Sequence, residues 1–447
     1  MKDNGQNLYV GIDIGGTKIL AALVKGNGGV IATKRCPTPR SGTGRSIITA
    51  ATTLAGGLLS GQKLSWRDVT AAGVAVPGVP HPSSGRVVFS PNTNLVGVEV
   101  VPLLEKSFGV PVAIGNDVNL GTMGEYWQGA GRGARSVVGM FVGTGIGGGI
   151  IIDGKLVTGC REAAAEVGHI IIQIGGPQCG CGNHGCLEAL ASRTAIERDI
   201  RQAVKLGAKT ALTAIVGKKL AVIKSSALKQ ALRQNDKLVT SILRRASEVL
   251  GYACLTIRHL LDPEVIVIGG GVVEACGDFM MPVIERIAMH HSVQGIGHAG
   301  RIMRSKLGDD AVVLGAVALA IRKVRGDKDQ RADSRAHEVA LRPDGSVVVG
   351  GQAVTGDVFI RPNGKAKPRR KPTGKIGLKE AVKMTKGHPQ AIVIAADKPG
   401  SIVFTDAARA ILRERGVNVS VLPVARAVEA YNAETRRRAL LIHRART

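Results

Sequence analysis

The segment Asp13–Lys18 (Asp-Ile-Gly-Gly-Thr-Lys) combines residue types that suit the binding of a nucleotide phosphate. Glycines allow a close backbone approach, so that main-chain N–H groups can point at phosphate oxygens. Thr17 adds a hydroxyl donor, Lys18 adds a positive charge, and Asp13 adds a carboxylate that can hold Mg²⁺ or its water shell. An ordinary β-hairpin turn is the alternative. The residues expected to bind nucleotide here are Asp13, Gly15, Gly16, Thr17 and Lys18.

Two further glycine-rich runs follow apolar stretches that we expect to be strands. One lies within residues 143–149, after the strand predicted for Val137–Val142, and the other follows Val265–Ile268. Three glycine-rich loops at the ends of three strands suit a nucleotide held between two lobes, although none has the Walker A spacing. From these two runs we expect nucleotide contacts by Thr144, Gly145, Gly147, Gly269, Gly270 and Gly271.

The pair Asn116-Asp117 stands just after another apolar stretch, Val110–Ile114. A carboxylate at the end of a buried strand can accept the proton from a hydroxyl that attacks the γ-phosphate of ATP. Asp117 is therefore the candidate general base. The alternative is that this pair forms an Asx turn that caps the next helix.

Three of the seven cysteines lie together, and nine residues separate His169 from the first of them. One imidazole and three thiolates form a closed tetrahedral set, which favours structural Zn²⁺ over catalytic zinc. A redox site is the alternative, although redox pairs usually have Cys-x-x-Cys spacing. An odd cysteine count with one tight cluster argues against a disulfide framework. The expected metal ligands are His169, Cys179, Cys181 and Cys186.

The elements that must position these residues alternate between strands and helices, which predicts an α/β fold. Residues 187–261 are mostly of helical type, and their clearest helix is Val239–Leu261, where apolar residues recur on one stripe. The other expected elements are a strand–turn–strand over 8–23, helices over 46–59 and 100–108, a strand over 69–76 and a closing helix over 312–324.

Residues 8 to about 324 resemble the ROK family, named for repressors, open reading frames and kinases, within the actin/hexokinase ATPase fold. The motifs that carry the resemblance are Asp13–Lys18, Gly115–Asn119, Gly143–Gly149, Glu166–His169 and Cys179–Glu188, all in the order and at the spacing of the family. The resemblance implies a two-lobed, ribonuclease H-like fold over residues 1–325, with a cleft between the lobes.

The resemblance also implies roles for the polar residues of these motifs. Asp117 would be the catalytic base, and His169 would both ligate zinc and reach a sugar hydroxyl. A further sugar-binding Asn of the family is carried over to Asn94, with Asn92 as a competing position, because the Pro and Trp that follow it in the family are absent here. The implied sugar-binding residues are Asn94, Asn116, Asp117, Glu166, His169 and Glu188.

The activity that the resemblance implies is ATP-dependent phosphorylation of a hexose, with glucose to glucose 6-phosphate as the leading reaction. ATP, Mg²⁺ and structural Zn²⁺ would be bound, and a homodimer is expected because the family is commonly dimeric. The alternatives are a kinase for N-acetylmannosamine, N-acetylglucosamine, fructose or mannose, and a sugar-responsive regulatory or assembly protein with a vestigial kinase site.

The 447-residue chain has a net charge of +26, so its electrostatic field attracts anions. The charge alone does not identify a binding partner. The basic loop 364–375 has no interleaved aromatic residues for base stacking, so nucleic acid is not the favoured partner. There is no apolar run long enough for a transmembrane helix and no signal-peptide pattern, so a cytoplasmic protein without membrane contact is expected.

Composition shifts at residues 326–336, a charged stretch without periodicity that we interpret as a linker. Residues 337–447 predict a separate small α/β domain, in which residues 424–443 would form the last helix. This part is similar to a small α/β family whose relatives include a mitochondrial complex I assembly factor. The matching segments are Gly350–Phe359, Ala391–Ala395, Gly416–Val419 and Tyr431-Asn432.

Overall fold

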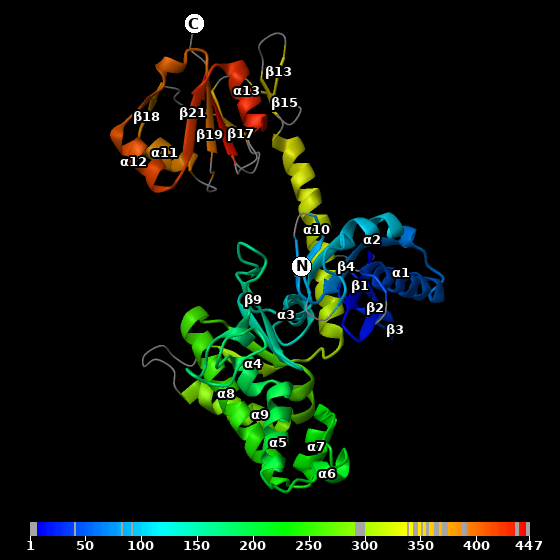
Figure 1. Cartoon of the computed structure of the whole chain (residues 1–447). Helices are drawn as coiled ribbons and strands as arrows, with labels where there is room; N and C mark the ends of the chain where they lie inside the picture. Colours follow the sequence, from blue (N-terminus) through cyan, green and yellow to red (C-terminus); the bar gives the residue numbers. More distant parts are fainter. Residues whose placement is uncertain are drawn as a thin grey trace. The chain divides into compact units, whose positions relative to one another are not determined.

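The computed structural model divides the chain into two compact units, Met1–Val324 and Arg325–Thr447 (Figure 1). It describes residues 7–39, 42–81, 84–90, 93–290, 300–337, 339–342, 347–349, 352–354, 357–361, 366–368, 374–385, 389, 391–433 and 438–443. None of the helices formed by these residues has both the length and the apolarity that crossing a membrane requires.

The first sheet of unit 1 has the strand order β3-β2-β1-β4-β7. Its strands are β1 Leu8–Ile14, β2 Lys18–Lys25, β3 Val30–Pro37, β4 Val69–Val76 and β7 Val112–Asn116. The first three pair antiparallel, whereas β1, β4 and β7 run parallel. The predicted strand–turn–strand at the N-terminus is therefore confirmed, and the carboxyl ends of three parallel strands meet at one edge.

Helices cover both faces of this sheet. Strand residues alternate between two cores: Val10 and Ile12 pack with α1 (Gly44–Gly61) and α2 (Val100–Phe108), whereas Tyr9 packs with α3 and α10. The latter two helices are Asp117–Gln128 and Asp310–His337. This alternation follows from the two-residue period of a strand.

The second sheet of unit 1 has the order β10-β9-β8-β11-β12. Its strands are β8 Val137–Val142, β9 Ile146–Ile152, β10 Lys155–Leu156, β11 Val265–Gly269 and β12 Arg301–Arg304. The helices of this lobe are α4 Leu187–Ala191, α5 Arg193–Lys205, α6 Leu212–Ile215, α7 Ser225–Arg233, α8 Lys237–Leu261 and α9 Gly271–His290. The predicted helix Val239–Leu261 corresponds to α8, whose stripe of buried residues, including Leu243 and Leu250, belongs to the core of this lobe.

The second glycine-rich run is a turn followed by a strand, and not one continuous loop as expected. Only the residues before Ile146 form the turn, and Gly147 already belongs to β9. A Cβ on Gly149 would collide with the Thr122 side chain on α3, so the glycines here let a helix and a strand approach closely.

Two differences from the sequence prediction concern the end of the chain. Helix α10 continues through the charged stretch expected to be an aperiodic linker, and its Arg, Lys, Gln and Ala residues have high helix propensity. The helix predicted over Val424–His443 is wrong in its second half, because α13 is Val424–Ala433 and β22 is Arg438–His443.

Unit 2 is built on a sheet of order β17-β16-β22-β19-β21. Its strands are β16 Val358–Ile360, β17 Ala366–Pro368, β19 Ala391–Ala396 and β21 Asn418–Leu422, with helices α11 Leu378–Met384 and α12 Asp406–Glu414. A separate small sheet contains β13 Val339–Leu341, β14 Val347–Val349 and β15 Gln352–Val354. The central position of β22 explains its apolar run, which suits a strand buried on both faces as well as a helix.

Candidate active site and metal cluster

Asn116 and Asp117 lie where β7 ends and α3 begins. The Oδ1 atom of Asn116 accepts hydrogen bonds from the backbone N–H groups of Val118 and Asn119, both at 3.0 Å, and so caps α3. Its Nδ2 atom donates to the carbonyl oxygen of Gly78 at 3.0 Å. The Asx cap that the sequence allowed is present, and it holds Asp117 in the first turn, where the helix dipole favours a carboxylate.

Asp13 and Asp117 share the edge of the first sheet where the parallel strands end. In the strand register, Asp13 is beside Ala75, and Ala75 is beside Gly115, two residues before Asp117. The two carboxylates interact, since the charge of Asp117 is the second cause, after burial, that raises the pKa of Asp13 to about 7. The topology thus brings together two acids that are 104 residues apart in the sequence.

The pKa of Asp117 is raised to about 6, mainly because the side chain is buried. Hydrogen bonds from the Val118 amide and from Asn116 oppose this rise, and the negative charge of Glu166 adds to it. A carboxyl group with this pKa is mostly ionised at neutral pH and can still accept a proton, as a general base requires.

The turn between β1 and β2 is held by hydrogen bonds to its backbone. The Gly15 N–H donates to the Lys18 carbonyl oxygen at 3.0 Å, and the Thr38 hydroxyl donates to the Gly15 carbonyl oxygen at 2.6 Å. The Lys18 Nζ atom lies 2.6 Å from Asp309 Oδ2, but the two side chains are 42% and 69% exposed. Such an exposed ion pair is weak, so Lys18 remains available to a phosphate.

The glycine turn before β9 is anchored to the second lobe by hydrogen bonds, three of which involve side chains. The Arg193 Nη2 atom donates to Thr144 Oγ1 at 2.7 Å, and the Thr194 hydroxyl donates to the Thr144 carbonyl oxygen at 2.7 Å. The backbone N–H of Ile146 donates to Glu188 Oε2 at 2.8 Å. Glu188, which the sequence predicts to bind the sugar, supports the glycine turn through this hydrogen bond.

The third glycine-rich run joins β11 to α9. Gly269 ends the strand, Gly271 begins the helix, and Gly270 between them has a φ of 86°, which favours glycine. Glu274 in the first turn of α9 has a raised pKa because of burial and the nearby charge of Asp309. Asp309 is also the ion-pair partner of Lys18. This glycine turn and the turn that contains Lys18 therefore lie close to one another.

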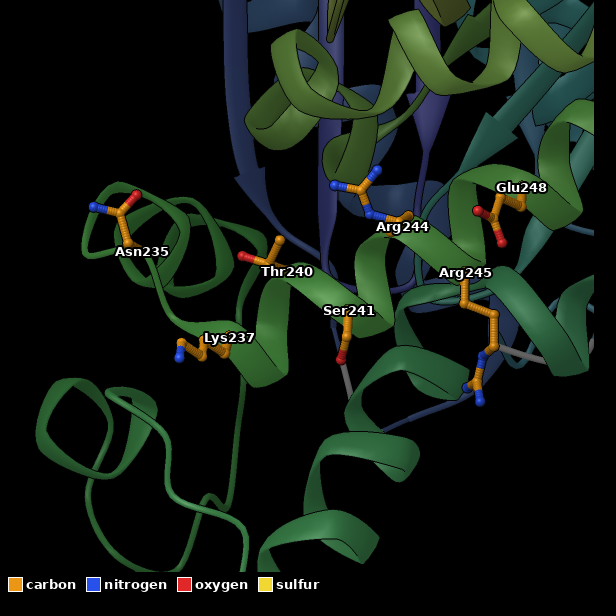
Figure 2. A pocket seen from close by; sticks show the side chains of 7 residues that line it. All are labelled: Asn235, Lys237, Thr240, Ser241, Arg244, Arg245 and Glu248. Atoms are coloured by element: carbon orange, nitrogen blue, oxygen red, sulfur yellow. The ribbon is translucent and has the colours of Figure 1, made fainter.

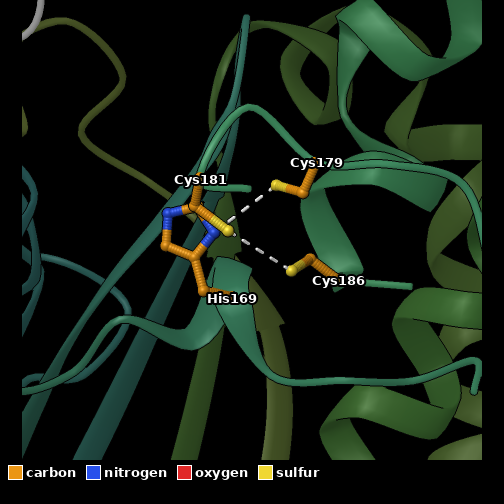
Figure 3. A group of neighbouring side chains, drawn as sticks. All are labelled: His169, Cys179, Cys181 and Cys186. Atoms are coloured by element: carbon orange, nitrogen blue, oxygen red, sulfur yellow. Dashed lines mark hydrogen bonds between the residues drawn. The ribbon is translucent and has the colours of Figure 1, made fainter. Parts of the chain in front are cut away.

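His169, Cys179, Cys181 and Cys186 form one cluster, as the sequence predicted (Figure 3). Their potential ligand atoms all lie within 4.8 Å of one another. His169 Nδ1 is 3.7 Å from Cys179 Sγ, and the Sγ atoms of Cys181 and Cys186 are also 3.7 Å apart. One imidazole nitrogen and three sulfurs at this spacing are a donor set that fits a structural zinc ion.

A cavity of ≈ 50 Å³ lies beside the candidate base. Of the expected sugar-binding residues, Asn116 and Glu166 line it. Two polar residues that the sequence analysis missed, Asn119 and Glu162, line it as well. Asn119 belongs to the Gly-Asn-Asp-Val-Asn motif, so its residue type and position are a signal in the sequence, whereas no pattern distinguishes Glu162. The remaining lining residues are Gly78, Val79, Val118, Gly147, Gly148, Ala164 and Ala165.

Asn94 is not among the residues that line this cavity. Its side chain is exposed, and its Nδ2 atom donates to the Gly42 carbonyl oxygen at 3.3 Å. The competing position, Asn92, lies outside the described residues, as do Lys365, Arg369, Arg370 and Lys371 of the basic C-terminal loop.

A larger hollow of ≈ 420 Å³ runs along α8 (Figure 2). Its arginines already make structural contacts: the Arg244 guanidinium lies 5.8 Å from the centre of the Phe279 ring, and Arg245 pairs with Asp199. The remaining lining residues are Asn235, Lys237, Thr240, Ser241 and Glu248. Because both arginines are already engaged and the smaller cavity adjoins Asp117, the smaller cavity is the better candidate.

Comparison with known proteins identifies what this arrangement resembles. The model of the ROK family matches residues 9–323. A glucokinase of Halalkalibacterium halodurans is 32% identical over 308 residues, which are 69% of this chain and 93% of that protein. The xylose repressor of Caldicellulosiruptor bescii is 31% identical over 255 residues, covering 57% of this chain and 63% of the repressor.

A solved structure resembles unit 1 in both sequence and shape. It is a ROK family glucokinase from Streptomyces griseus in complex with glucose and AMPPNP. It is 32% identical, has a TM-score of 0.62, and the match covers 71% of this chain and 100% of that chain. The two-lobed ATPase-like sugar kinase fold expected from the sequence is thereby confirmed.

Proposed function

The chain belongs to the ROK family, and from that premise we propose that it transfers the γ-phosphoryl group of ATP to glucose, giving glucose 6-phosphate and ADP. The observation that carries the proposal is the position of Asp117. Its carboxylate stands at the sheet edge shared with Asp13, next to a cavity lined by Asn116 and Glu166. The glucokinase relatives, at 32% identity, favour glucose as the acceptor.

In this proposal Asp117 accepts the proton of the sugar's primary hydroxyl as that oxygen attacks the γ-phosphorus. The new O–P bond forms while the bond from the γ-phosphorus to the β,γ-bridging oxygen breaks, and ADP leaves. The cap by Asn116 holds the base in place before the sugar arrives. Positioning and charge neutralisation supply most of the rate in phosphoryl transfer, so rigid placement of the base and phosphate turns is what the fold must provide.

In this proposal Asp13 and Lys18 bind the triphosphate of ATP, Asp13 through Mg²⁺ and Lys18 directly. Asp13 would hold Mg²⁺, whose charge would neutralise the phosphate oxygens. The fit is supported by the raised pKa of Asp13, which burial and the charge of Asp117 cause and which only Lys18 opposes. A site in which buried carboxylates repel one another favours a bound cation. Lys18 would exchange its exposed contact with Asp309 for a phosphate oxygen.

The cysteine cluster would hold Zn²⁺ as a structural ion. Its loop leads directly into α4, and Glu188 in the first turn of that helix supports the glycine turn at Ile146. His169 lies three residues after the cavity residue Glu166, in the short helix η2 (Val167–His169). The ion would therefore fix the wall of the sugar site and the glycine turn together.

The test is an ADP-release assay with ATP and a panel of glucose, mannose, fructose, N-acetylglucosamine and N-acetylmannosamine. We expect glucose to give the highest kcat/KM. The Asp117→Asn variant should lose about 10²–10⁴-fold in kcat while glucose affinity, measured by calorimetry, changes little. The exposed Asp153, which pairs with Arg135, supplies the control Asp153→Asn. Unchanged turnover in Asp117→Asn would reject this base, and glucose binding without turnover would favour a sugar-responsive regulator.

A further inference from the structure

The loop that precedes Glu166 has an unusual backbone. Glu162 and Ala165 have φ values of 57° and 68°, in the left-handed region that glycine adopts readily and other residues rarely do. Both residues line the cavity beside the candidate base. Unfavourable backbone conformations of this kind cluster at ligand-binding sites, where the surrounding structure holds a side chain in a required place.

The strained conformation places the carboxylate of Glu162 at the cavity. Its Oε1 atom accepts a hydrogen bond from the Thr158 hydroxyl at 3.1 Å. Within the described part of the chain, neither another hydrogen bond nor an ion pair neutralises this carboxylate. A carboxylate has room for about four hydrogen bonds, so most of its acceptor capacity is free for a ligand.

Asn119 contributes a second free acceptor from a different element, α3. The residue is only 7% exposed, and its Oδ1 atom is buried without a hydrogen-bond partner among the described residues. Buried polar atoms nearly always have a partner, and an exception calls for a ligand or another specific explanation. Because Asn119 also lines the cavity, a polar group of a sugar that reaches into that cavity can supply the missing donor.

We propose that Asn119 and Glu162 form an acceptor pair that recognises one hydrogen-bond donor of the hexose, and that the substrate is a sugar with a free hydroxyl or ammonium group at that position. This inference rests on the proposed sugar kinase function and deepens it. Sugars that lack the donor, through deoxygenation or O-acylation, are rejected because they leave the buried Asn119 oxygen and the half-buried Glu162 carboxylate without that partner.

The first experiment separates recognition from strain. In Glu162→Gln the left-handed backbone stays but the charge is lost, whereas Glu162→Gly removes both. We expect kcat/KM for glucose to fall about tenfold in either variant, while Glu162→Gly melts at an equal or higher temperature because strain is relieved. Lys63 has a φ of 56° and does not line the cavity, so Lys63→Gly is the control that should change stability but not kinetics.

The second experiment identifies the donor. Glucose, its single-position deoxy analogues, glucosamine and N-acetylglucosamine are compared in calorimetric binding and in turnover. One deoxy analogue should bind the wild type far more weakly than glucose, and this difference should shrink about tenfold in Glu162→Gln and in Asn119→Ala. The ratio of glucose to analogue is the decisive readout, since general damage to the fold lowers both values alike.

The possible outcomes distinguish recognition by Asn119 and Glu162 from the proposed kinase activity. Sugar binding without phosphorylation by the wild type would contradict the proposed kinase activity and leave the recognition measurable by calorimetry. Equal discrimination among the sugars in wild type, Glu162→Gln and Asn119→Ala would overturn the inference, even with full kinase activity. Failure of every sugar to bind the wild type would overturn both.

Discussion

Glu188 accepts a hydrogen bond from the backbone N–H of Ile146 at 2.8 Å, across 42 residues of sequence. Its other oxygen, Oε1, lies 3.8 Å from the Sγ atom of Cys179 in the metal cluster. A single carboxylate therefore connects the cysteine loop with the glycine turn of the proposed nucleotide site. Whatever displaces that loop also withdraws the support of the turn.

Removal of the metal should consequently impair both substrates and not the sugar alone. We expect a strong chelator to lower the melting temperature and to raise KM for glucose and for ATP severalfold, with recovery when Zn²⁺ is restored. Thermal melts, metal analysis and steady-state kinetics on the same samples check this. Full stability and activity in a preparation shown to lack metal would refute a structural role for the cluster.

The rate should depend on the ionisation of Asp117. Burial raises the pKa of this carboxyl to about 6, and a general base acts only when it is unprotonated. We therefore expect kcat/KM to fall below pH 6 by about tenfold per unit and to level off above it. A pH–rate profile measures this, with stability followed at each pH. A profile that is flat between pH 5 and 8 would contradict the assignment.

Asp13 should reduce the stability of the free protein at neutral and alkaline pH. Burial and the charge of Asp117 raise its pKa to about 7, above the value of 3.8 that it has without such surroundings. The folded state thus holds the proton more tightly than the unfolded state, so stability is lost as the pH rises through about 7.

The corresponding measurement is the melting temperature of Asp13→Asn at pH 4 and pH 8 without nucleotide or Mg²⁺. The variant should melt a few degrees above the wild type at pH 8, where the wild-type carboxylate is charged, and at nearly the same temperature at pH 4. An equal gain in melting temperature at pH 4 and pH 8 would mean that the charge of Asp13 is not what destabilises the wild type.

Glu125 should be important for stability although it lies outside the proposed site. This carboxylate is fully buried on α3 and accepts hydrogen bonds from the Ser305 hydroxyl at 2.6 Å and from the amides of Lys306, Leu307 and Ala130. The loop that it holds continues to Asp309, the partner of Lys18.

In Glu125→Gln an amide N–H₂ group would face backbone N–H donors in place of a carboxylate oxygen. We expect a loss of about 2–4 kcal/mol in the free energy of unfolding and a higher KM for ATP. Guanidinium denaturation and kinetics test both effects, with Glu248→Gln on α8 as the control. A Glu125→Gln variant as stable as the control would show that these hydrogen bonds contribute little.

Much of the fold could be predicted because its signals are local. The helix α1 and the strands β4 and β8 follow the expected ranges closely, since apolar periodicity directly reports one buried face or two. β22 differs from the predicted helix because Ala439–Ile442 is an uninterrupted apolar run, which suits either element. Only its place between β16 and β19 makes it a strand.

The sequence by itself determined the chemistry available: the phosphate turn at Asp13–Lys18, the acid after β7 and the ligand set of the metal cluster, three of whose members lie within eight residues. Those features are short-range, so spacing and residue type suffice to identify them. Tertiary structure decided which distant groups meet, such as Lys18 with Asp309, and it placed Asn119 and Glu162 at one cavity. Such contacts depend on strand order, burial and strained loop geometry, and no local pattern encodes them.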